Sequence, residues 1–517
     1  MATSSLLSAD TDVSNSYAKI VDELRETFDE GRTLPLEFRL NQLKALHLLV
    51  EENFDKMLAA VHKDMRKAKM EGASYELELL KIDAVAAIRE LKQWMKREMM
   101  PFNLLLPLDK AYVKHDPYGV VLIIGAWNYP FLLSLQPLIG AIAAGNCVVI
   151  KPSEHSSNAA TTIAELVPKY LDPACFRVVL GAAPETIELL ENKFDYIFAT
   201  SSTRIGKCVM QAAAKHLTPV TLELGGKSPV YIDDDSDIEI ASRRVIWGKC
   251  INLGQTCIAP DYILCSKSTE KRFIEHVKHT LQEWYGQDPQ KSSDLTRIIN
   301  NQNFLRLQKL LKDTKGRIAI GGETSEEDLF ISPTIVADVK ATDSLMTEEL
   351  FGPILPILTV NSKEEALKFI KERPKPLALY VFSKNQRTLE YFIEKTTSGA
   401  ICCNDVVVQN GWEGLPFGGV GDSGIGHYHG KYSYETFVHK KSVVQRSFSK
   451  VGEKIYAARY PPYNNWNMKV IAGFMKYLHI FEMRARPVTL FATFMAGAIA
   501  SVAVTVGWLT GFKKRND

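Results

Sequence analysis

The sequence predicts an α/β protein with two doubly wound parallel-sheet domains, a small β arm and a C-terminal transmembrane helix. Two series of strands alternating with helices predict the sheets, one over residues 120–226 and one over residues 238–403. An apolar run without charges, Val488–Thr510, predicts the membrane helix. The length of 517 residues suits this division, because one compact domain usually holds about 100–200 residues.

The composition excludes several classes of protein. Lys+Arg is 62 and Asp+Glu is 60, so the formal net charge is only +2, and 46% of the residues are hydrophobic. A nucleic-acid binder needs basic stripes and a disordered chain needs low hydrophobicity, so neither is expected. The eight cysteines form no CxxC pair and no HExxH motif occurs, so we expect no metal site. The N-terminus lacks a secretory signal, which predicts reduced thiols.

The first predicted domain, residues 1–222, begins with helices and continues as a parallel sheet. Charged residues with apolar ones at helical spacing, such as Leu43, Leu46 and Leu49, predict several long helices over residues 17–93. The apolar runs that follow are continuous, which is typical of strands buried on both faces. The predicted strands lie at 120–126, 147–153, 176–181, 196–200 and 220–226, and the predicted helices at 132–143, 159–170, 185–191 and 204–215.

The second predicted domain, residues 223–432, is of similar size. Two doubly wound units suggest a cofactor domain and a catalytic domain with a cleft between them, because ligands of such sheets bind at the carboxyl ends of the strands. The predicted helices lie at 238–252, 270–312 and 389–395, and the predicted strands at 259–265, 377–382 and 400–403.

The C-terminal part predicts attachment to a membrane. A transmembrane helix is predicted over residues 487–511. Its apolar run Val488–Thr510 would be about 34 Å long as a helix, which is enough to cross a hydrocarbon core of about 30 Å. Basic residues flank the run on both sides, and the alternative is a buried core helix. Residues 464–486 carry apolar side chains at helical spacing, interrupted by Lys469 and Lys476. This pattern predicts an amphipathic helix on the bilayer surface, or one packed on the globular body.

Three residues stand in contexts that suit chemistry. Cys257 lies in a loop bounded by Gly254 and Pro260, where a nucleophile could be displayed; the alternative is a buried structural thiol. Glu223 lies within an apolar strand, where burial would raise its pKa towards that of a useful base; the alternative is a solvent-facing edge residue. Asn128 follows a buried strand and could donate to an oxyanion, or cap the next helix.

The segment Ser201–Gly206 follows a strand and opens a helix, the position of a phosphate-binding turn. It contains a single glycine, so it is a weak dinucleotide motif taken alone.

Together, these segments resemble the aldehyde dehydrogenases, most closely the class 3 branch with its membrane-anchored members. The resemblance runs from about residue 17 to residue 462. Six motifs match in order and spacing: GAWNYPF (125–131), KPSE (151–154), TLELGGKSP (221–229), GQTCIAPDY (254–262), EELFGP (348–353) and LPFGGVGDSG (415–424).

The resemblance implies a catalytic role for three residues. Cys257 would attack the aldehyde, Asn128 and the Cys257 backbone N–H would hold the oxyanion, and Glu223 would activate the water that hydrolyses the thioester.

The resemblance also implies NAD as the cofactor. Lys151 and Glu154 would bind the adenosine ribose, and Gly206, at the start of its helix, would lie under the pyrophosphate. Glu349 and Phe351 would position the nicotinamide ribose and ring. Because Glu154 would repel the 2′-phosphate of NADP, NAD is expected.

One position departs from the family pattern. Ser201 stands where the family usually has glycine, so we expect weaker or shifted cofactor binding there.

The resemblance further implies a homodimer, formed through an arm at 109–118 and a strand at 433–448. The membrane helix favours medium- and long-chain aliphatic aldehydes as substrates, because such aldehydes partition into the bilayer that the helix would bind. The catalytic domain would then be cytosolic, most plausibly at the endoplasmic reticulum, with peroxisomes and mitochondria open. The alternatives are a general detoxifying dehydrogenase for aromatic or peroxidation-derived aldehydes, an acylating dehydrogenase, and a membrane scaffold without activity.

Overall fold

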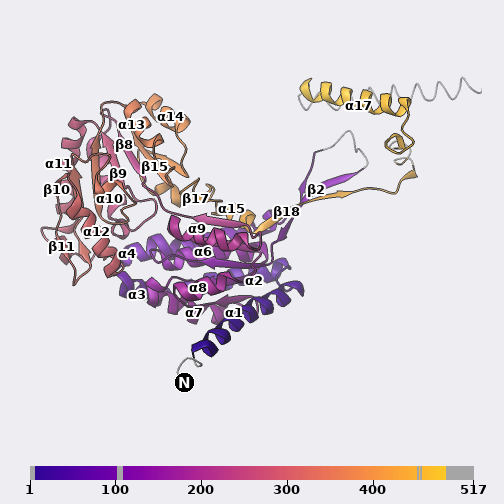
Figure 1. Ribbon diagram of the computed structural model, residues 1–517, viewed down its shortest axis with the longest axis horizontal. Coiled ribbons are helices and arrows are strands. Elements are labelled where there is room, and N and C mark those ends of the chain that lie inside the picture. The colour runs from indigo at the N-terminus through magenta and orange to yellow at the C-terminus, as the bar shows by residue number, and fades with distance from the viewer. Residues whose placement is uncertain (1–5, 102–108, 451–452, 454–456, 485–517) are drawn as a thin grey trace, which may run out of the picture. The chain divides into compact units, whose positions relative to one another are not determined.

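The computed structural model describes residues 6–101, 109–450, 453 and 457–484. The chain divides into two compact units. Unit 1 comprises residues 1–96 and 115–440, and unit 2 comprises residues 97–114 and 441–517. Both parallel sheets belong to unit 1 (Figure 1). Every residue singled out above for chemistry also falls within the residue range of unit 1.

The N-terminal part of unit 1 is helical, as predicted. Helix α2 buries Leu43, Leu46, Leu49 and Val50, the apolar residues whose spacing predicted it. It packs against α5 and α6, so these helices cover one side of the first sheet. The helices are α1 (Leu6–Asp29), α2 (Leu36–Glu52), α3 (Phe54–Met65), α4 (Lys69–Gly72) and α5 (Glu78–Trp94), with a π-helical turn, Ala73–Leu77, directly before α5.

The first sheet has six strands in the order β17-β7-β6-β3-β4-β5. Its strands are parallel except β17, which returns late in the chain and pairs antiparallel with β7, placing Gly424 opposite Glu223. The strands are β3 (Val120–Ile124), β4 (Cys147–Lys151), β5 (Phe176–Val178), β6 (Tyr196–Thr200), β7 (Val220–Glu223) and β17 (Gly424–Ile425), and the helices are α6 (Pro130–Ala144), α7 (Ser157–Tyr170), α8 (Ala183–Leu190), α9 (Thr203–Ala214) and α15 (Lys431–Thr436).

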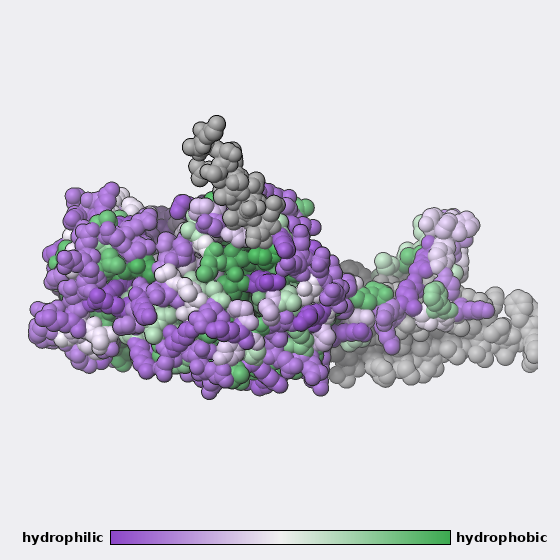
Figure 2. All heavy atoms as spheres, turned by 90° about the horizontal axis from the view of Figure 1, so that it is seen from below, coloured by the Kyte–Doolittle hydropathy of each residue, from purple (hydrophilic) through white to green (hydrophobic). Residues whose placement is uncertain are grey.

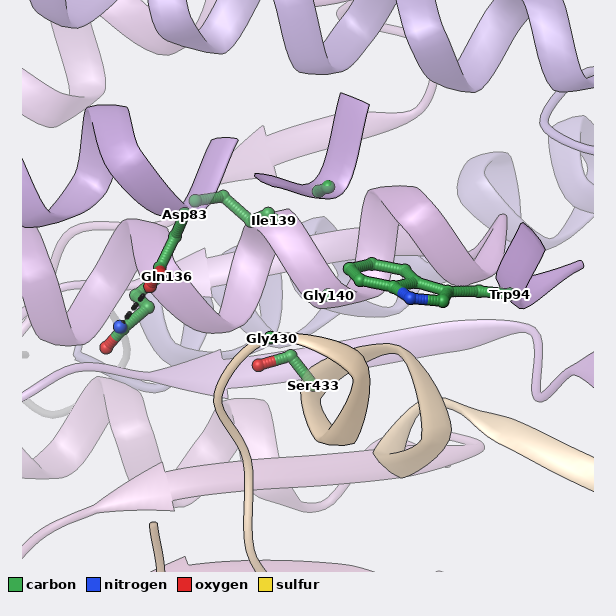
Figure 3. A pocket seen from close by; sticks show the side chains of 8 residues that line it. Asp83, Trp94, Gln136, Ile139, Gly140, Gly430 and Ser433 are labelled. Atoms are coloured by element: carbon green, nitrogen blue, oxygen red, sulfur yellow. Dashed lines mark hydrogen bonds between the residues drawn. The ribbon is translucent and has the colours of Figure 1, made fainter. Parts of the chain in front are cut away.

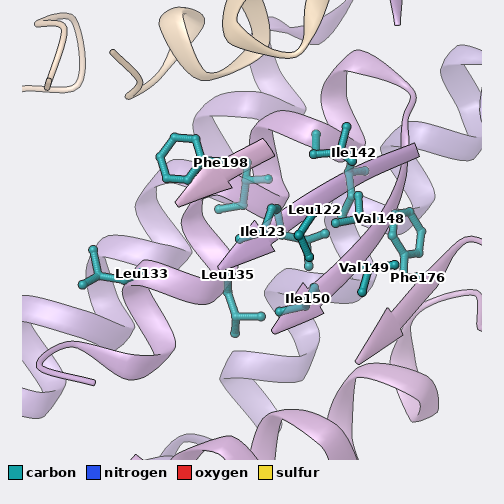
Figure 4. Packing of buried hydrophobic residues seen from close by; sticks show 14 of the residues in the cluster. Leu122, Ile123, Leu133, Leu135, Ile142, Val148, Val149, Ile150, Phe176 and Phe198 are labelled. Carbon is teal, nitrogen blue, oxygen red and sulfur yellow. The ribbon is translucent and has the colours of Figure 1, made fainter. Parts of the chain in front are cut away.

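The core of this sheet explains the continuous apolar runs of the sequence. Every residue of β3 and β4 is buried, and so is every residue of α6. Figure 4 shows Leu122 and Ile150 from these strands among Leu135, Ile142 and further apolar side chains of the cluster. A strand covered on both faces has no polar side, so no alternation appears in its sequence.

The second sheet has seven strands in the order β10-β13-β14-β9-β8-β15-β16, all parallel except β10. Apolar clusters lie on both of its faces. The strands are β8 (Pro229–Ile232), β9 (Tyr262–Cys265), β10 (Arg317–Ile320), β13 (Thr334–Ala337), β14 (Ile354–Thr359), β15 (Ala378–Phe382) and β16 (Ala400–Cys403), and the helices are α10 (Ile238–Cys250), α11 (Lys267–Tyr285), α12 (Asn301–Asp313), α13 (Lys363–Lys371) and α14 (Gln386–Lys395). A small hairpin of β11 (Thr324–Ser325) and β12 (Phe330–Ile331) lies between β10 and β13 in the chain.

The prediction of one helical stretch over residues 270–312 was wrong. The chain leaves α11 at Gly286, whose φ of +74° is a conformation that glycine tolerates, and Pro289 follows. Strands β8, β10, β13 and β14 were not predicted. The prediction of two parallel sheets is confirmed.

A three-stranded sheet forms the predicted β arm, in the order β1-β2-β18. Its strands are β1 (Glu98–Met99), β2 (Lys110–Pro117) and β18 (Val438–Gln445). In unit 2, helix α17 (Asn465–Arg484) falls within the predicted amphipathic segment and exposes Trp466, Met468 and Met475. Among the residues with described structure, none of the helices has the length and apolarity of a membrane span. The membrane helix predicted at 487–511 lies outside the described residues.

The face of the molecule in Figure 2 is mostly hydrophilic over unit 1, with separate apolar areas between charged side chains. Scattered exposed apolar residues are normal at protein surfaces. Of the residues singled out for chemistry, Lys151 and Glu223 end the buried strands β4 and β7, whereas Cys257 lies in the loop before β9.

Candidate active site

Cys257 lies in a loop that reaches it through an unusual turn. Helix α10 ends at Cys250, and Asn252, Leu253 and Gly254 then adopt φ values of +50°, +54° and +73°. A side chain on Gly254 would lie 2.3 Å from the Gly352 carbonyl oxygen, so only glycine fits. Left-handed conformations at Asn252 and Leu253 are costly, and they persist only where neighbouring contacts enforce them.

The side chain of Gln255 makes several of the hydrogen bonds that stabilise this turn. Its side-chain Nε2 donates to the carbonyls of Asn252 (3.1 Å) and Arg297 (3.0 Å), and its Oε1 accepts from the Ile299 N–H (3.0 Å). The Asn252 N–H donates to the Glu71 carboxylate at 2.9 Å. The turn before Cys257 is therefore fixed by buried hydrogen bonds that come from other parts of the chain.

The structure joins Asn128 to this loop. Asn128 is buried, and its side-chain Nδ2 donates to the Gln255 carbonyl at 3.0 Å. The alternative role as a helix cap does not hold, because Tyr129 takes the cap position of α6 and makes no side-chain capping bond. One of the two amide hydrogens of Asn128 is thus committed to the loop that carries Cys257, which leaves one for a ligand.

Glu223 is buried at the end of β7, not exposed at an edge. Neither of its carboxylate oxygens has a hydrogen-bond partner among the described residues, and burial raises its pKa well above the usual range. Its backbone, in contrast, is fixed, since its carbonyl accepts from the Ser201 N–H at 2.9 Å. Burial disfavours the charged form of this carboxyl group, so its carboxylate is a stronger base than an exposed one.

Glu349 is a second carboxyl group of this kind. Burial, followed by the charge of Asp261, raises its pKa to about 8, although the Gly226 N–H donates to it. A side chain on Gly225 would lie 2.0 Å from its Oε2, so Gly225 leaves room for this carboxylate. Phe351 follows with a φ of +51° and packs edge-to-face on Trp127 at 5.4 Å, next to Asn128.

The pKa of the Cys257 thiol depends on both carboxyl groups. It is half-buried, and its pKa is raised above the ordinary value by burial, then by Glu349 and by Glu223. Its own N–H and that of Ile258 donate to the sulfur and act in the opposite direction. The structure thus brings Cys257 close enough to both acids for them to affect its pKa, and Gln255 joins its loop to Asn128.

Three of the predicted cofactor residues, Lys151, Glu154 and Ser201, lie at or just after the carboxyl ends of strands in the first sheet. Lys151 ends β4 and forms a 2.9 Å ion pair with Glu154. Burial acts to raise the pKa of Glu154, but the Lys151 ammonium outweighs it and holds that pKa below its usual range. Ser201 follows β6 and is partly exposed. This edge of the sheet therefore carries hydroxyl and charged groups, the kind that bind ligands at the carboxyl ends of parallel strands.

Helix packing requires a glycine at position 206, which the sequence alone did not indicate. A side chain there would lie 2.6 Å from the Leu224 side chain, so the glycine lets α9 approach the segment after β7. Ser202 caps α9 by accepting from the Ile205 N–H at 3.4 Å.

A separate cavity lies away from these residues, between α5, α6 and the start of α15 (Figure 3). It measures about 10 Å³, room for at most one water molecule. Gln136 donates to Asp83 beside it, and burial raises the pKa of Asp83 to about 6. This cavity is too small for an organic substrate.

Sequence reasoning missed several residues that support the site. Lys67, Glu76, Asn252 and Gln255 are fully buried and hydrogen-bonded around Asn128. Gln255 lies within the motif GQTCIAPDY (254–262), but the other three residues gave no signal in the sequence.

Known proteins resemble the chain over most of its length. The model of the aldehyde dehydrogenase family matches residues 6–443. Aldehyde dehydrogenase family 3 member B2 of Mus musculus is 49% identical, covering 87% of this chain and 93% of its own. Family 3 member A2 of Macaca fascicularis is 46% identical, covering 94% and 99%.

Solved structures agree with this similarity. The substrate-bound state of Staphylococcus aureus AldH has 41% identity and a TM-score of 0.85, covering 88% of this chain and 99% of that one. A mutant P. syringae indole-3-acetaldehyde dehydrogenase in complex with NAD+ and IAA has 25% identity and a TM-score of 0.74, covering 84% and 89%. By sequence and fold, the chain is an enzyme that belongs to the aldehyde dehydrogenase family, among the family 3 members.

Proposed function

We propose that the protein oxidises aliphatic aldehydes of medium and long chain to carboxylic acids, with NAD as the oxidant and Cys257 as the nucleophile. The observation that carries this proposal is the 3.0 Å hydrogen bond from the Asn128 amide to Gln255, because it fixes an amide donor on the loop that carries the thiol. Glu223 and Glu349 stand close enough to raise the pKa of that thiol.

The chain's own residues account for each proton and bond. The Glu223 carboxylate takes the thiol proton and passes it to solvent, and the Cys257 sulfur forms a bond to the carbonyl carbon as the carbonyl π bond breaks. The Asn128 amide and Cys257 N–H donate to the resulting oxyanion. Bound NAD would supply the hydride acceptor and a positive charge beside the thiol. Glu223 then takes a proton from a water molecule, whose oxygen attacks the acyl carbon as the sulfur leaves, and the carboxylic acid is released.

The residues at the carboxyl edge of the first sheet fit a dinucleotide. The Thr200 hydroxyl, at the end of β6, is buried without a hydrogen-bond partner among the described residues, as expected beside an absent polar ligand. Lys151 and Glu154 offer a donor and an acceptor for ribose hydroxyls. The carboxylate of Glu154 disfavours a 2′-phosphate, which supports NAD over NADP. Dissociation constants for both cofactors test this preference, and tighter NADP binding would contradict it.

The surroundings of Cys257 support an apolar substrate. The thiol shares one apolar cluster with Trp247, Val407 and Phe417, all partly buried. In the segment between Val407 and Phe417, the side chains of Trp412 and Leu415 are 68% and 48% exposed. An alkyl chain that covered such surface would gain about 25 cal/mol per Å² of buried apolar area.

The principal test is a steady-state profile of NADH formation against aldehyde chain length, with Cys257→Ser as the control. We expect kcat/KM to rise from hexanal to hexadecanal and the control to be inactive. A flat profile, with preference for aromatic aldehydes, would favour a general detoxifying role. A CoA-dependent thioester product in place of the free acid would favour an acylating dehydrogenase.

We also propose that the C-terminal segment binds the enzyme to a membrane, with the catalytic domain on the cytosolic side and the endoplasmic reticulum as the expected membrane. In the described part of this segment, α17 exposes Trp466, Met468 and Met475 beside Lys469, a pattern that suits a lipid surface. Ending the chain after residue 463 should release it from sedimenting vesicles and lower hexadecanal activity more than hexanal activity. Equal losses for the two substrates would contradict a role of this segment in delivering substrate.

The β arm supports a homodimer as a further proposal. Strand β18 is rich in β-branched residues and exposes most of its length. Analytical ultracentrifugation of a variant with proline at Val443 should show a monomer, because proline cannot donate to a pairing strand.

A further inference from the structure

A fully buried lysine lies under the proposed oxyanion site. Lys67 connects α3 to α4, and its side chain has no exposed surface. Its ammonium donates to Glu76 Oε1 at 2.6 Å and to the Asn128 carbonyl at 2.7 Å. The third direction points at the Tyr129 ring, 4.1 Å from the ring centre. An ammonium has three donors, and each meets a partner, which compensates part of the cost of burying the charge.

The contact between Lys67 and the Asn128 carbonyl holds the Asn128 backbone in place. The Asn128 carbonyl accepts from Lys67 and also from the Asn252 side-chain Nδ2 at 2.9 Å. Both lone pairs of that oxygen are therefore used. Because the Asn128 side chain is bonded to the Gln255 carbonyl, its backbone and its amide are held from opposite sides.

The contact with the ring leads to the second oxyanion donor. The Tyr129 hydroxyl lies 2.8 Å from the Thr256 hydroxyl. Thr256 directly precedes Cys257, so this bond acts on the peptide that carries the Cys257 N–H. The Lys67 ammonium thus contacts Asn128, whose amide is one oxyanion donor. It also contacts the Tyr129 ring, whose hydroxyl restrains the peptide that carries the other donor, the Cys257 N–H.

Glu76 completes the arrangement from its own side. Its Oε2 accepts from the Phe131 N–H at 3.1 Å, in the first turn of α6, where amides lack partners inside the helix. A carboxylate is favourable at that end of a helix. Glu76 lies in the π-helical turn Ala73–Leu77, a distortion found often at functional sites.

We infer that Lys67, paired with Glu76, is a positioning residue that holds the Asn128 amide and the Cys257 N–H at the spacing an oxyanion requires. The inference rests on the proposed function. Lys67 touches neither thiol nor substrate, so its effect passes through Asn128 and Tyr129. A pair with only a structural role would support folding and cofactor binding equally and would not act on one chemical step.

The test uses a double variant, Lys67→Met with Glu76→Gln, which removes both charges and leaves neither buried alone. The matched control is Lys56→Met with Glu165→Gln, which breaks a 2.7 Å pair at the surface. The measurements are kcat/KM for hexanal, the dissociation constant of NADH by fluorescence, and the primary isotope effect on kcat with 1-deuterated hexanal.

We expect the double variant to lose about 100-fold in kcat/KM, the usual scale for one oxyanion donor. NADH binding should stay within twofold of the control, and the isotope effect should rise because hydride transfer has become slower than hydrolysis. Activity within threefold of the control would overturn the inference. So would a loss that weakens NADH binding in proportion and leaves the isotope effect unchanged.

A second variant covers the case in which the double variant fails to fold. Tyr129→Phe keeps the buried pair and the ring but removes the hydroxyl bonded to Thr256, and it should lower kcat/KM about tenfold with a raised isotope effect; an unchanged value would again overturn the inference. The proposed function itself fails only if the unmodified protein forms no NADH from aldehydes. The two failures are therefore distinguishable.

Discussion

The raised pKa of Glu349 makes a prediction about stability that can be worked out from the structure. The carboxyl group titrates near its usual value of 4.5 in the unfolded chain and at about 8 in the folded protein. Between these values, the folded state binds more protons than the unfolded state, so the free energy of unfolding must fall as the pH rises. The effect is absent below pH 4.5 and complete above about pH 8.

The magnitude follows from about 1.36 kcal/mol for each pKa unit. Between pH 5 and pH 8, the loss reaches at most about 4 kcal/mol, and the partial exposure of the side chain reduces the expected value to about 2 kcal/mol. Glu349→Gln does not titrate, so the variant should gain this amount over the original protein as the pH rises. For a chain of this length, that is a difference of roughly 2 °C in Tm.

The assay is thermal unfolding followed by tryptophan fluorescence at pH 5, 6.5 and 8. Glu348→Gln is the control, because it removes the neighbouring carboxylate, which is paired with Arg306 at 2.9 Å on the surface. The difference in Tm between Glu349→Gln and the original protein should widen steadily with pH, and the control should not show this trend. A difference that stays flat from pH 5 to pH 8 would refute the assignment of a high pKa to Glu349.

Three other substitutions test the cofactor side of the site. Gly225→Ala places a methyl group 2.0 Å from Glu349 Oε2, so the carboxylate must move, and kcat should fall about tenfold with little change in circular dichroism; unchanged kinetics would show that this position is unimportant. Ser201→Gly should tighten NAD binding in calorimetry if the serine weakens it, and an unchanged dissociation constant would contradict that hypothesis. Glu154→Gln should raise the ratio of NADP to NAD activity about tenfold, because one repulsive charge is removed, whereas an unchanged ratio would mean that Glu154 does not select the cofactor.

The sequence predicts the fold where local pattern and tertiary environment agree. Strands β3 and β4 are buried on both faces, so their apolar runs predict them directly. The prediction of one helix over 270–312 was wrong because helical spacing continues on both sides of the break between α11 and α12. Gly286 and Pro289 mark this break, and the prediction did not take them into account. Short strands such as β8 and β13 have four residues each and carry too little pattern to be recognised alone.

The residues of the candidate site also fall into two groups, those that the sequence indicates and those that only the fold brings into place. Cys257, Glu223 and Asn128 lie within the motifs that resemble the aldehyde dehydrogenases, so the resemblance predicts a role for each of them. Lys67 and Asn252 have no local signal. A lysine in a charged helical stretch is typical of a solvated surface, and only the folded chain brings its ammonium under Asn128. Contacts between residues so distant in sequence are set by the packing of α3 and α4, which no local pattern encodes.

Buried charge marks this site independently of the motifs. Lys249 is buried just before the turn to Cys257; its ammonium lies 3.9 Å from Asp261 and makes no hydrogen bond among the described residues, and burial lowers its pKa to about 8. Glu223 and Glu349 have pKa values raised by burial in the same region. Desolvating such groups costs stability, and folding alone gives no reason to gather them beside a half-buried thiol. A site that must move protons does give that reason, because Lys249 and Glu349, with pKa values of about 8, exchange protons readily near neutral pH.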